Sequence, residues 1–176
     1  AVGCGALLSN VNDNDNTGVG FATLVNSSGQ QNTAVGSSAL NSNTSATGNT
    51  AVGYYASEAN TTGASNVAVG SCALLCNISG AENTAVGMNA ARLTTGSANV
   101  AVGHSALEDN TSGASNTALG REALHTNTTA SNNVAVGKRA LYLNTTGTNN
   151  SAVGKDALNN NTEGDNNVAV GTGALV

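Results

Sequence analysis

The sequence predicts an all-β fold, a parallel β-solenoid (β-roll) of about ten coils with 17 residues in each. Three observations lead to this prediction. The motif Ala-Val-Gly recurs at near-constant spacing along the whole chain, and the repeated unit is too short for two packed helices. The composition, with one Phe and no Trp among 176 residues, lacks the large side chains of a globular core.

The glycine of the motif sets the period. It recurs at intervals of 16 or 17 residues, at Gly3, Gly20, Gly36, Gly53, Gly70, Gly87, Gly103, Gly120, Gly137, Gly154 and Gly171. The consensus unit is T/V-A-V-G-x-x-A-L-x-x-N-T-T/S-G-x-x-N. The 16-residue units lose their residue in the variable stretch after A-L, where a surface loop tolerates a deletion. We therefore treat residues 1–176 as a single repeat array.

Each part of the unit has its own expected structure. The T/V-A-V segment is typical of a short strand that ends at Gly, and N-T-T-G is typical of a turn. We expect the A-L pair to lie in a second extended segment. The Gly, Asn and Thr content opposes a helix. Successive coils should stack about 4.8 Å apart, which places equivalent residues above one another.

Stacking groups the apolar residues into columns. We expect one inward column from the valines of the motif: Val2, Val19, Val35, Val52, Val69, Val86, Val102, Leu119, Val136, Val153 and Val170. We expect a second from the leucines of A-L: Leu7, Leu24, Leu40, Leu74, Leu107, Leu124, Leu141, Leu158 and Leu175.

The alanine before each valine should then lie on the opposite face of the strand, since side chains alternate. Its constancy predicts tight packing against further copies of the chain. The predicted oligomer interface consists of Ala34, Ala51, Ala68, Ala85, Ala101, Ala118, Ala135, Ala152 and Ala169.

Asparagine recurs at two positions of the unit. The Asn that ends each unit predicts amide ladders between coils. The Asn before T-T/S-G creates candidate N-glycosylation sites at Asn26, Asn43, Asn60, Asn77, Asn110, Asn127 and Asn144, with further ones at Asn149 and Asn160. The alternative is that Asn and Thr build the turn. In-register glycans would crowd at about 4.8 Å per coil, which favours the turn.

The charge pattern bears on partners. A net charge of −5 with five basic residues argues against nucleic acid or an anionic membrane as a partner. No apolar run approaches the length of a membrane span.

We predict no catalytic residues, no cofactor and no metal. His104 and His125 fall in variable positions of different coils. Two pairs of oppositely charged sequence neighbours, Arg121 with Glu122 and Lys155 with Asp156, are expected to be solvent-exposed ion pairs without a catalytic role.

Two further motifs are weak. The acidic run Asn12–Asn16 predicts a hydrated turn, with a Ca²⁺ site as the alternative. Cys4, Cys72 and Cys76 lack the spacing of a metal site, and their redox state stays open.

The motif N-T/V-A-V-G-x-x-A, seen at residues 66–73 and 133–140, resembles the head repeats of trimeric autotransporter adhesins of the YadA type. Related repeats occur in phage tail fibres and other bacterial surface fibres. The resemblance covers essentially the whole chain and implies left-handed β-rolls, three chains side by side, that bind host or matrix surfaces. It also implies an extracellular location, on a cell surface or a virion fibre. The unit here is longer than the usual head repeat, because it contains N-T-T-G.

Together these features predict a structural extracellular fibre or adhesin module that self-associates as a homotrimer or end-to-end filament. A host-surface or glycan ligand is the expected partner. Both ends fall within a unit, which predicts a segment of a longer array without caps.

Three alternatives remain. A glycosylated filament without an adhesive role is the first. An ice-binding solenoid would need a flat, regular Thr face, whereas Thr is regular only beside Gly in the turns. A carbohydrate-processing enzyme would need paired carboxylates in neighbouring coils, and no acidic pair repeats.

Overall fold

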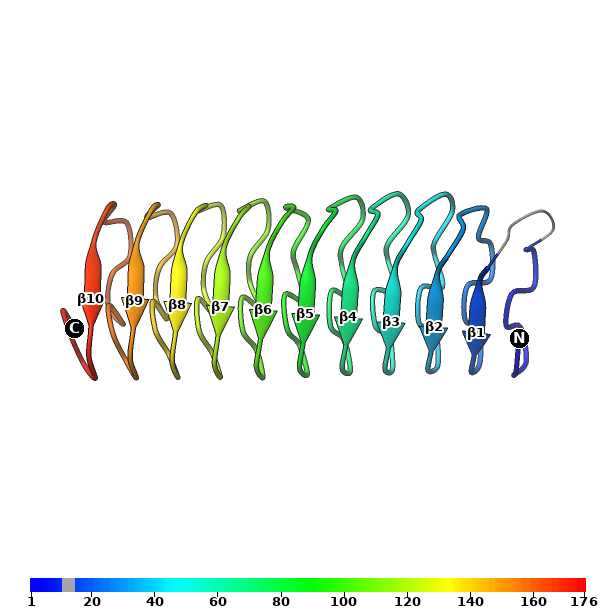
Figure 1. Cartoon of the computed structure of the whole chain (residues 1–176), viewed down its shortest axis with the longest axis horizontal. Helices are drawn as coiled ribbons and strands as arrows, with labels where there is room; N and C mark the ends of the chain where they lie inside the picture. Colours follow the sequence, from blue (N-terminus) through cyan, green and yellow to red (C-terminus); the bar gives the residue numbers. More distant parts are fainter. Residues whose placement is uncertain (11–14) are drawn as a thin grey trace.

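The computed structural model describes residues 1–10 and 15–176, and it is a single stack of coils with one short strand in each (Figure 1). All ten strands form one parallel sheet in chain order. The strands are β1 (Thr17–Val19), β2 (Thr33–Val35), β3 (Thr50–Val52), β4 (Val67–Val69), β5 (Thr84–Val86), β6 (Val100–Val102), β7 (Thr117–Leu119), β8 (Val134–Val136), β9 (Ser151–Val153) and β10 (Val168–Val170). The predicted β-solenoid is confirmed.

Equivalent residues of successive coils are paired without slippage. Ala68 pairs with Ala85, and this register is the same from β1 to β10. The 16-residue units keep it too, because Thr17 pairs with Thr33 and Thr84 with Val100. The missing residue is therefore absorbed in a turn and leaves the sheet unchanged.

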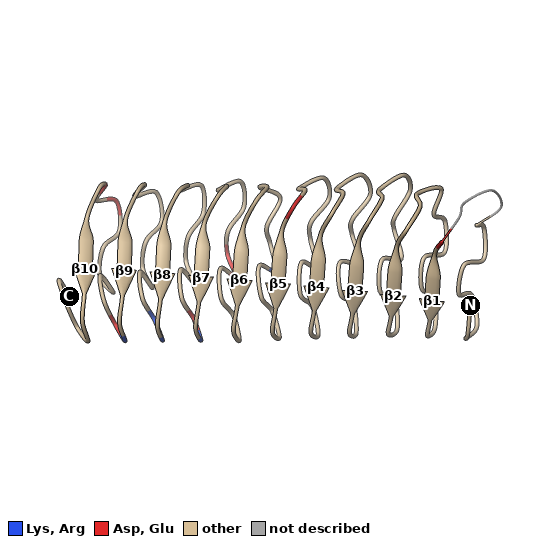
Figure 2. Ribbon diagram, viewed as in Figure 1, with Lys and Arg blue, Asp and Glu red and all other residues tan. Residues whose placement is uncertain are grey.

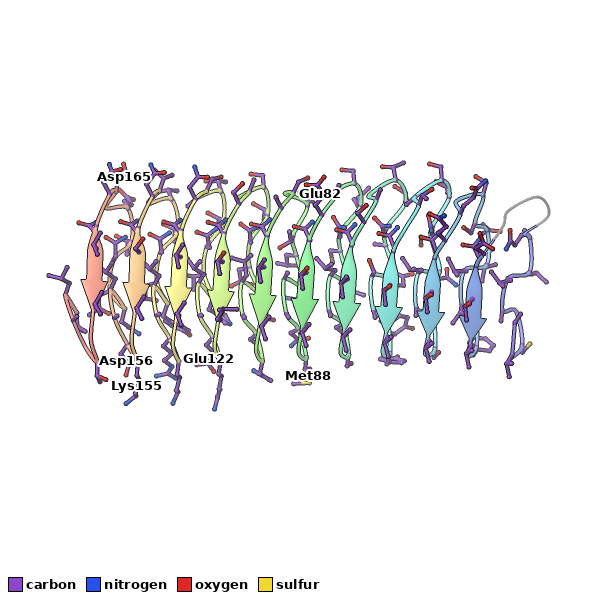
Figure 3. All side chains as sticks on the ribbon, in the orientation of Figure 1. Glu82, Met88, Glu122, Lys155, Asp156 and Asp165 are labelled. Carbon is purple, nitrogen blue, oxygen red and sulfur yellow. The ribbon has the colours of Figure 1, made fainter. Side chains whose placement is uncertain are left out.

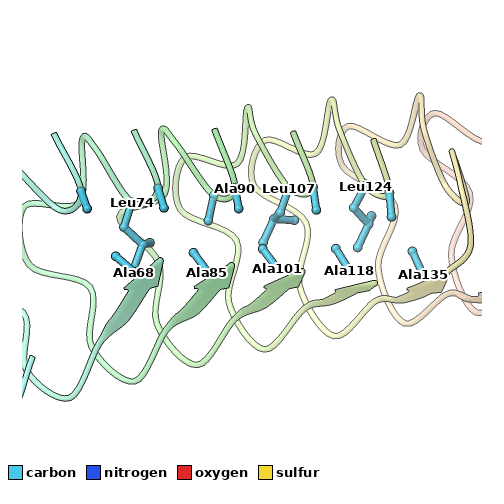
Figure 4. Close-up of a cluster of buried hydrophobic side chains, with 14 of the residues drawn as sticks. Ala68, Leu74, Ala85, Ala90, Ala101, Leu107, Ala118, Leu124 and Ala135 are labelled. Atoms are coloured by element: carbon cyan, nitrogen blue, oxygen red, sulfur yellow. The ribbon is translucent and has the colours of Figure 1, made fainter. Parts of the chain in front are cut away.

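The interior is a thin layer between two walls. From the sheet, the central alanine of each strand from β2 to β10 points inward, and from the opposite wall the alanine and leucine of A-L point back at it (Figure 4). Ala68, Ala85 and Leu74 are all completely buried. Because leucine fills most of the space between the walls, alanine is the side chain that fits opposite it.

This arrangement reverses the predicted orientation of the strands. Val153 is 40% exposed and its neighbour Ala152 is 0% exposed, so the prediction that the valines point inward is wrong. The predicted alanine interface is wrong for the same reason. Ala34, Ala51, Ala68, Ala85, Ala101, Ala118, Ala135, Ala152 and Ala169 pack inside their own chain and offer no surface to a second copy. The leucine column points inward from Leu7 to Leu158, as predicted, whereas Leu175 in the last coil is 63% exposed.

The A-L segment also differs from expectation, because it forms turns and not an extended strand. Leu74 and Leu107 have φ values of 51° and 56°, in the left-handed region. That conformation costs a leucine about 1–2 kcal/mol, which burial of the side chain offsets with about 1.5–3 kcal/mol. The backbone N–H of Leu74 donates to the carbonyl of Ala90 in the next coil (3.0 Å), so this wall is bonded between coils as well.

The predicted asparagine ladders are present and buried. The backbone N–H of Asn66 donates to Oδ1 of Asn49 in the preceding coil (2.9 Å), and Nδ2 of Asn66 donates to the carbonyl of Gly80 in the next coil (2.8 Å). Asn77 holds the same Gly80 from its other side, through the backbone N–H and the carbonyl, both at 2.9 Å. The last Asn of one unit and the turn Asn of the next therefore bind the same glycine, and together with Asn49 these hydrogen bonds connect three successive coils.

Candidate interaction surfaces

The outer face of the sheet carries two regular columns of mostly β-branched residues, which we call the strand face. One column is the third residue of every strand, valine in nine and Leu119 in β7. The other is the first residue of every strand, a mixture of Thr, Val and one Ser. Figure 1 shows the strands side by side with little change of direction, so both columns run straight along the stack.

The valines of the strand face are substantially open to solvent. Val52, Val86 and Val102 are exposed by 36 to 38%, although they lie in the middle of the stack. An array of this kind in register is a contiguous apolar surface, which in proteins usually marks an interaction site.

A second surface lies at the turn that follows each strand. Arg121, Lys138 and Lys155 occupy the same place in three consecutive coils, two residues after the end of β7, β8 and β9. Arg139 follows Lys138 directly. We call these four residues the cationic edge. Figure 2 shows their blue segments close together along this edge of the molecule.

One carboxylate organises the cationic edge. Glu122 accepts from Nη2 of Arg121 through Oε1 and from Nε of Arg139 through Oε2, both at 2.8 Å. The hydrogen bond from Arg139, assisted by Arg121, lowers the pKa of Glu122 to about 2. Lys155 lies 3.3 Å from the carboxylate of Asp156. Both predicted ion pairs are therefore present, each within one coil, and the contact of Arg139 with Glu122 adds a link between coils.

The opposite wall carries a third group of polar side chains in successive coils. Nε of Arg92 donates to Oε1 of Glu108 (3.0 Å), and Nε2 of His125 lies 3.5 Å from Oε2 of the same carboxylate. The ring of His125 is 5.3 Å from that of Tyr142. Burial raises the pKa of Glu108, but hydrogen bonds from Ser105 and Arg92 outweigh it and the pKa is lowered. These side chains link successive coils. His104 is not one of them, because it lies in the turn after β6, at the position that Arg121 occupies after β7.

Most of the candidate glycosylation sites are enclosed. Asn43, Asn60, Asn77, Asn110, Asn127 and Asn144 are completely buried and belong to the inner ladder. Their Nδ2 atoms donate within the coil, as in the 2.9 Å bond from Asn60 to the carbonyl of Gly63. Asn26 differs, because its unit is one residue short and Ser27 occupies the buried position. Asn26, Asn149 and Asn160 are exposed.

The remaining candidates do not assemble into a centre. Across the described residues, no group of three or more His, Cys, Asp or Glu side chains is placed to hold a metal, and no pocket opens. In that same part of the chain, Cys4, Cys72 and Cys76 are free thiols. Of the acidic run, residues 12–14 lie outside the described residues, and Asn16 donates to the carbonyl of Gly29 (2.7 Å) as a member of the terminal ladder.

Residues 1–10 and 15–176 include no helix long and apolar enough to cross a membrane. No protein-family model, curated protein or solved structure matches the chain.

Proposed function

We propose that this chain is a rigid structural module of an extracellular fibre or adhesin, without enzymatic activity, whose copies associate through the strand face. The observation that carries this proposal is the double column of outward, mostly β-branched residues along all ten strands, interrupted only by Leu119 and Ser151. The corrected orientation moves the expected oligomer interface from the alanines to the valines.

The partner that fits the strand face best is another copy of the chain. The columns advance by about 4.8 Å per coil, and a surface with the same repeat can match every valine along the stack. A second copy of the chain has the same repeat, because its coils have the same spacing. A homotrimer of parallel copies, which the resemblance implies, would bury the valine columns along the fibre axis and leave the turns outside.

The exposed turns would then carry whatever the fibre binds. The residue after the motif glycine changes from coil to coil, with Phe21, Tyr54, Met88 and Lys138 among its occupants, while the inner columns vary much less. A rigid scaffold with variable turns suits attachment to a host surface or a glycan. This assignment includes an extracellular location, on a cell surface or a virion fibre.

The molar mass in solution tests the proposal. Light scattering on the purified chain should give a multiple of 17.1 kDa. Val102→Lys should reduce the mass to 17.1 kDa and leave the far-ultraviolet circular dichroism spectrum unchanged, because Val102 points outward. Met88→Lys is the matched control, because Met88 is exposed in the turn after β5, away from the strand face. This substitution should not affect association.

A monomeric wild type would overturn the proposed self-association. If Val102→Lys and Met88→Lys dissociated the oligomer to the same extent, the strand face would not be the interface.

Ice binding is the second candidate, and the structure favours it more than the sequence did. Thr17, Thr33, Thr50, Thr84 and Thr117 stand on the strand face beside the valines, so the face offers hydroxyl and methyl groups in register. An ice-binding chain must keep this face open to water, whereas a self-associating one covers it. Thermal hysteresis by a monomeric wild type would favour ice binding.

The glycosylated filament is a weaker alternative, because burial leaves only Asn26 of the seven principal sites accessible, together with Asn149 and Asn160.

A further inference from the structure

We propose that the cationic edge, formed by Arg121, Lys138, Arg139 and Lys155, binds an extended acidic polysaccharide that lies along the solenoid axis. The inference rests on the proposed attachment function and names the chemical class of the ligand. It uses a different surface from the strand face, so the two proposals can fail separately.

The concentration of charge is the first observation. Four of the five Lys and Arg residues of the chain lie in the cationic edge, with two carboxylates beside them, Glu122 and Asp156, which gives 4 − 2 = +2. The rest of the chain has one basic residue and eight acidic ones, which gives 1 − 8 = −7 and adds up to the net charge of −5. A positive patch on so acidic a chain attracts anions at one place only.

The second observation is the register of the cations. Leu119 pairs with Val136 and Val136 with Val153, so the residues two positions further on are also stacked. Arg121, Lys138 and Lys155 therefore repeat about every 4.8 Å. The side chains of Arg121, Arg139 and Lys155 are 59, 45 and 59% exposed, while that of Glu122 beneath them is 13% exposed. The cations thus face solvent and the central carboxylate does not.

The stacking of like charges is unfavourable in the free protein. Cations in adjacent positions of neighbouring strands or turns repel each other, and Glu122 neutralises only part of that repulsion. The same position holds uncharged residues such as Ser37, Tyr54 and Ser71 in earlier coils, so the fold itself does not require a cation there. A ligand with its own row of anions along the axis would relieve the repulsion.

An acidic polysaccharide has the required form. It is extended, it carries carboxylate or sulfate groups at regular intervals, and each monosaccharide advances the chain by about the rise of one coil. Guanidinium groups bind such anions through paired hydrogen bonds. Duplex DNA and anionic vesicles fit less well, because the remaining −7 charge of the chain would face their continuous negative surfaces.

Binding of the full chain to immobilised heparin, which is sulfated, and alginate, which is carboxylated, tests the inference. We expect binding to at least one of them, weakened by added salt, and none to neutral dextran. Replacing Arg121, Lys138 and Lys155 together by Gln should weaken binding about tenfold or more, which corresponds to 1.4 kcal/mol or more. Arg139 stays in place in this variant to hold Glu122.

Arg92→Gln is the matched control, because Arg92 is the one basic residue outside the cationic edge and lies on the opposite wall. Its binding should equal that of the wild type, and circular dichroism should show all variants folded. The inference is overturned by no binding to either polysaccharide, by an equal loss in Arg92→Gln, or by tighter binding to duplex DNA or phosphatidylserine vesicles. An oligomeric protein that binds neither polysaccharide would remove this inference and leave the proposed self-association intact.

Discussion

Oδ1 of Asn133 accepts a 2.8 Å hydrogen bond from the backbone N–H of Asn150, one coil further along the stack. Nδ2 of Asn133 donates at the same time to the carbonyl of Gly147 (2.8 Å). Both groups of the amide are therefore used inside a buried interior, where an unpaired polar group is costly. This explains why the last residue of the unit is constant although it contributes little apolar area.

Asn133→Ala should destabilise the solenoid by about 1–3 kcal/mol, because it leaves the buried N–H of Asn150 without its partner. The carbonyl of Gly147 keeps the hydrogen bond from Nδ2 of Asn144 (2.9 Å). The midpoint of urea unfolding measures the effect. Asn160→Ala is the control, since Asn160 is exposed and is not among the residues with a left-handed φ. Equal midpoints for the two variants would show that the ladder does not hold the coils together.

Neighbouring residues of β9 should respond oppositely to one substitution. Ala152→Asp places a charge in the closed interior and should unfold the adjacent coils, at a cost of several kcal/mol. Val153→Asp places it on the strand face, so the coil should stay folded while self-association weakens. Circular dichroism melting separates the outcomes. Unfolding by Val153→Asp but not by Ala152→Asp would restore the orientation expected from the sequence.

Gly70 of the motif should be more sensitive to substitution than Gly48, which lies in an open turn. Gly70 has φ 132°, and a Cβ placed on it would lie 2.6 Å from the carbonyl oxygen of Gly87, so Gly70→Ala should prevent normal stacking there. At Gly48, with φ 73°, the nearest atom is 3.8 Å away. Gly48→Ala should therefore cost only the left-handed conformation, about 1–2 kcal/mol. Thermal melting that ranks the two variants in the other order would contradict the tight contact.

The carboxylate of Glu122 in the cationic edge should be protonated only at very low pH. The folded-state pKa of Glu122 is about 2, below its ordinary value of 4.5, so its ion pairs stabilise the fold above pH 4.5 and this contribution is lost as the pH falls towards 2. Carbon-13 NMR titration of the carboxyl group measures this pKa. Arg139→Gln should raise it, because Arg139 supplies the largest stabilising contact; an unchanged value would contradict that cause.

The repeat predicted most of the architecture, because stacked coils require the same residue at the same place. The period predicted the number of coils, and the leucine column and the asparagine ladders followed from positions that vary little between units. The side of the strand that faces inward could not be predicted this way. Ala68 and Val69 are equally constant, and alternation assigns them to opposite faces without saying which is inside. The constancy of alanine did indicate tight packing, but the packing partner is Leu74 of the same chain.

The candidate surfaces were missed for related reasons. The strand face was assigned to the interior, so its exposed columns were not considered. The cationic edge left a signal in the sequence, since Arg121, Lys138 and Lys155 fall at one position of the unit in three successive repeats. The left-handed backbone conformation of Leu74 could not be predicted from the sequence. Leucine disfavours this conformation, and only the surrounding contacts enforce it.

Spin labels on the strand face would test the central claim, that outward valines hold copies of the chain together. In a variant with Cys4, Cys72 and Cys76 replaced by Ser, a nitroxide would be attached to a cysteine introduced by Val102→Cys or, as the control, by Met88→Cys. The account predicts immobilised labels with spin–spin broadening at position 102, which disappears on dilution with unlabelled chain, and mobile labels with sharp lines at position 88. Sharp, concentration-independent spectra at both positions would contradict it.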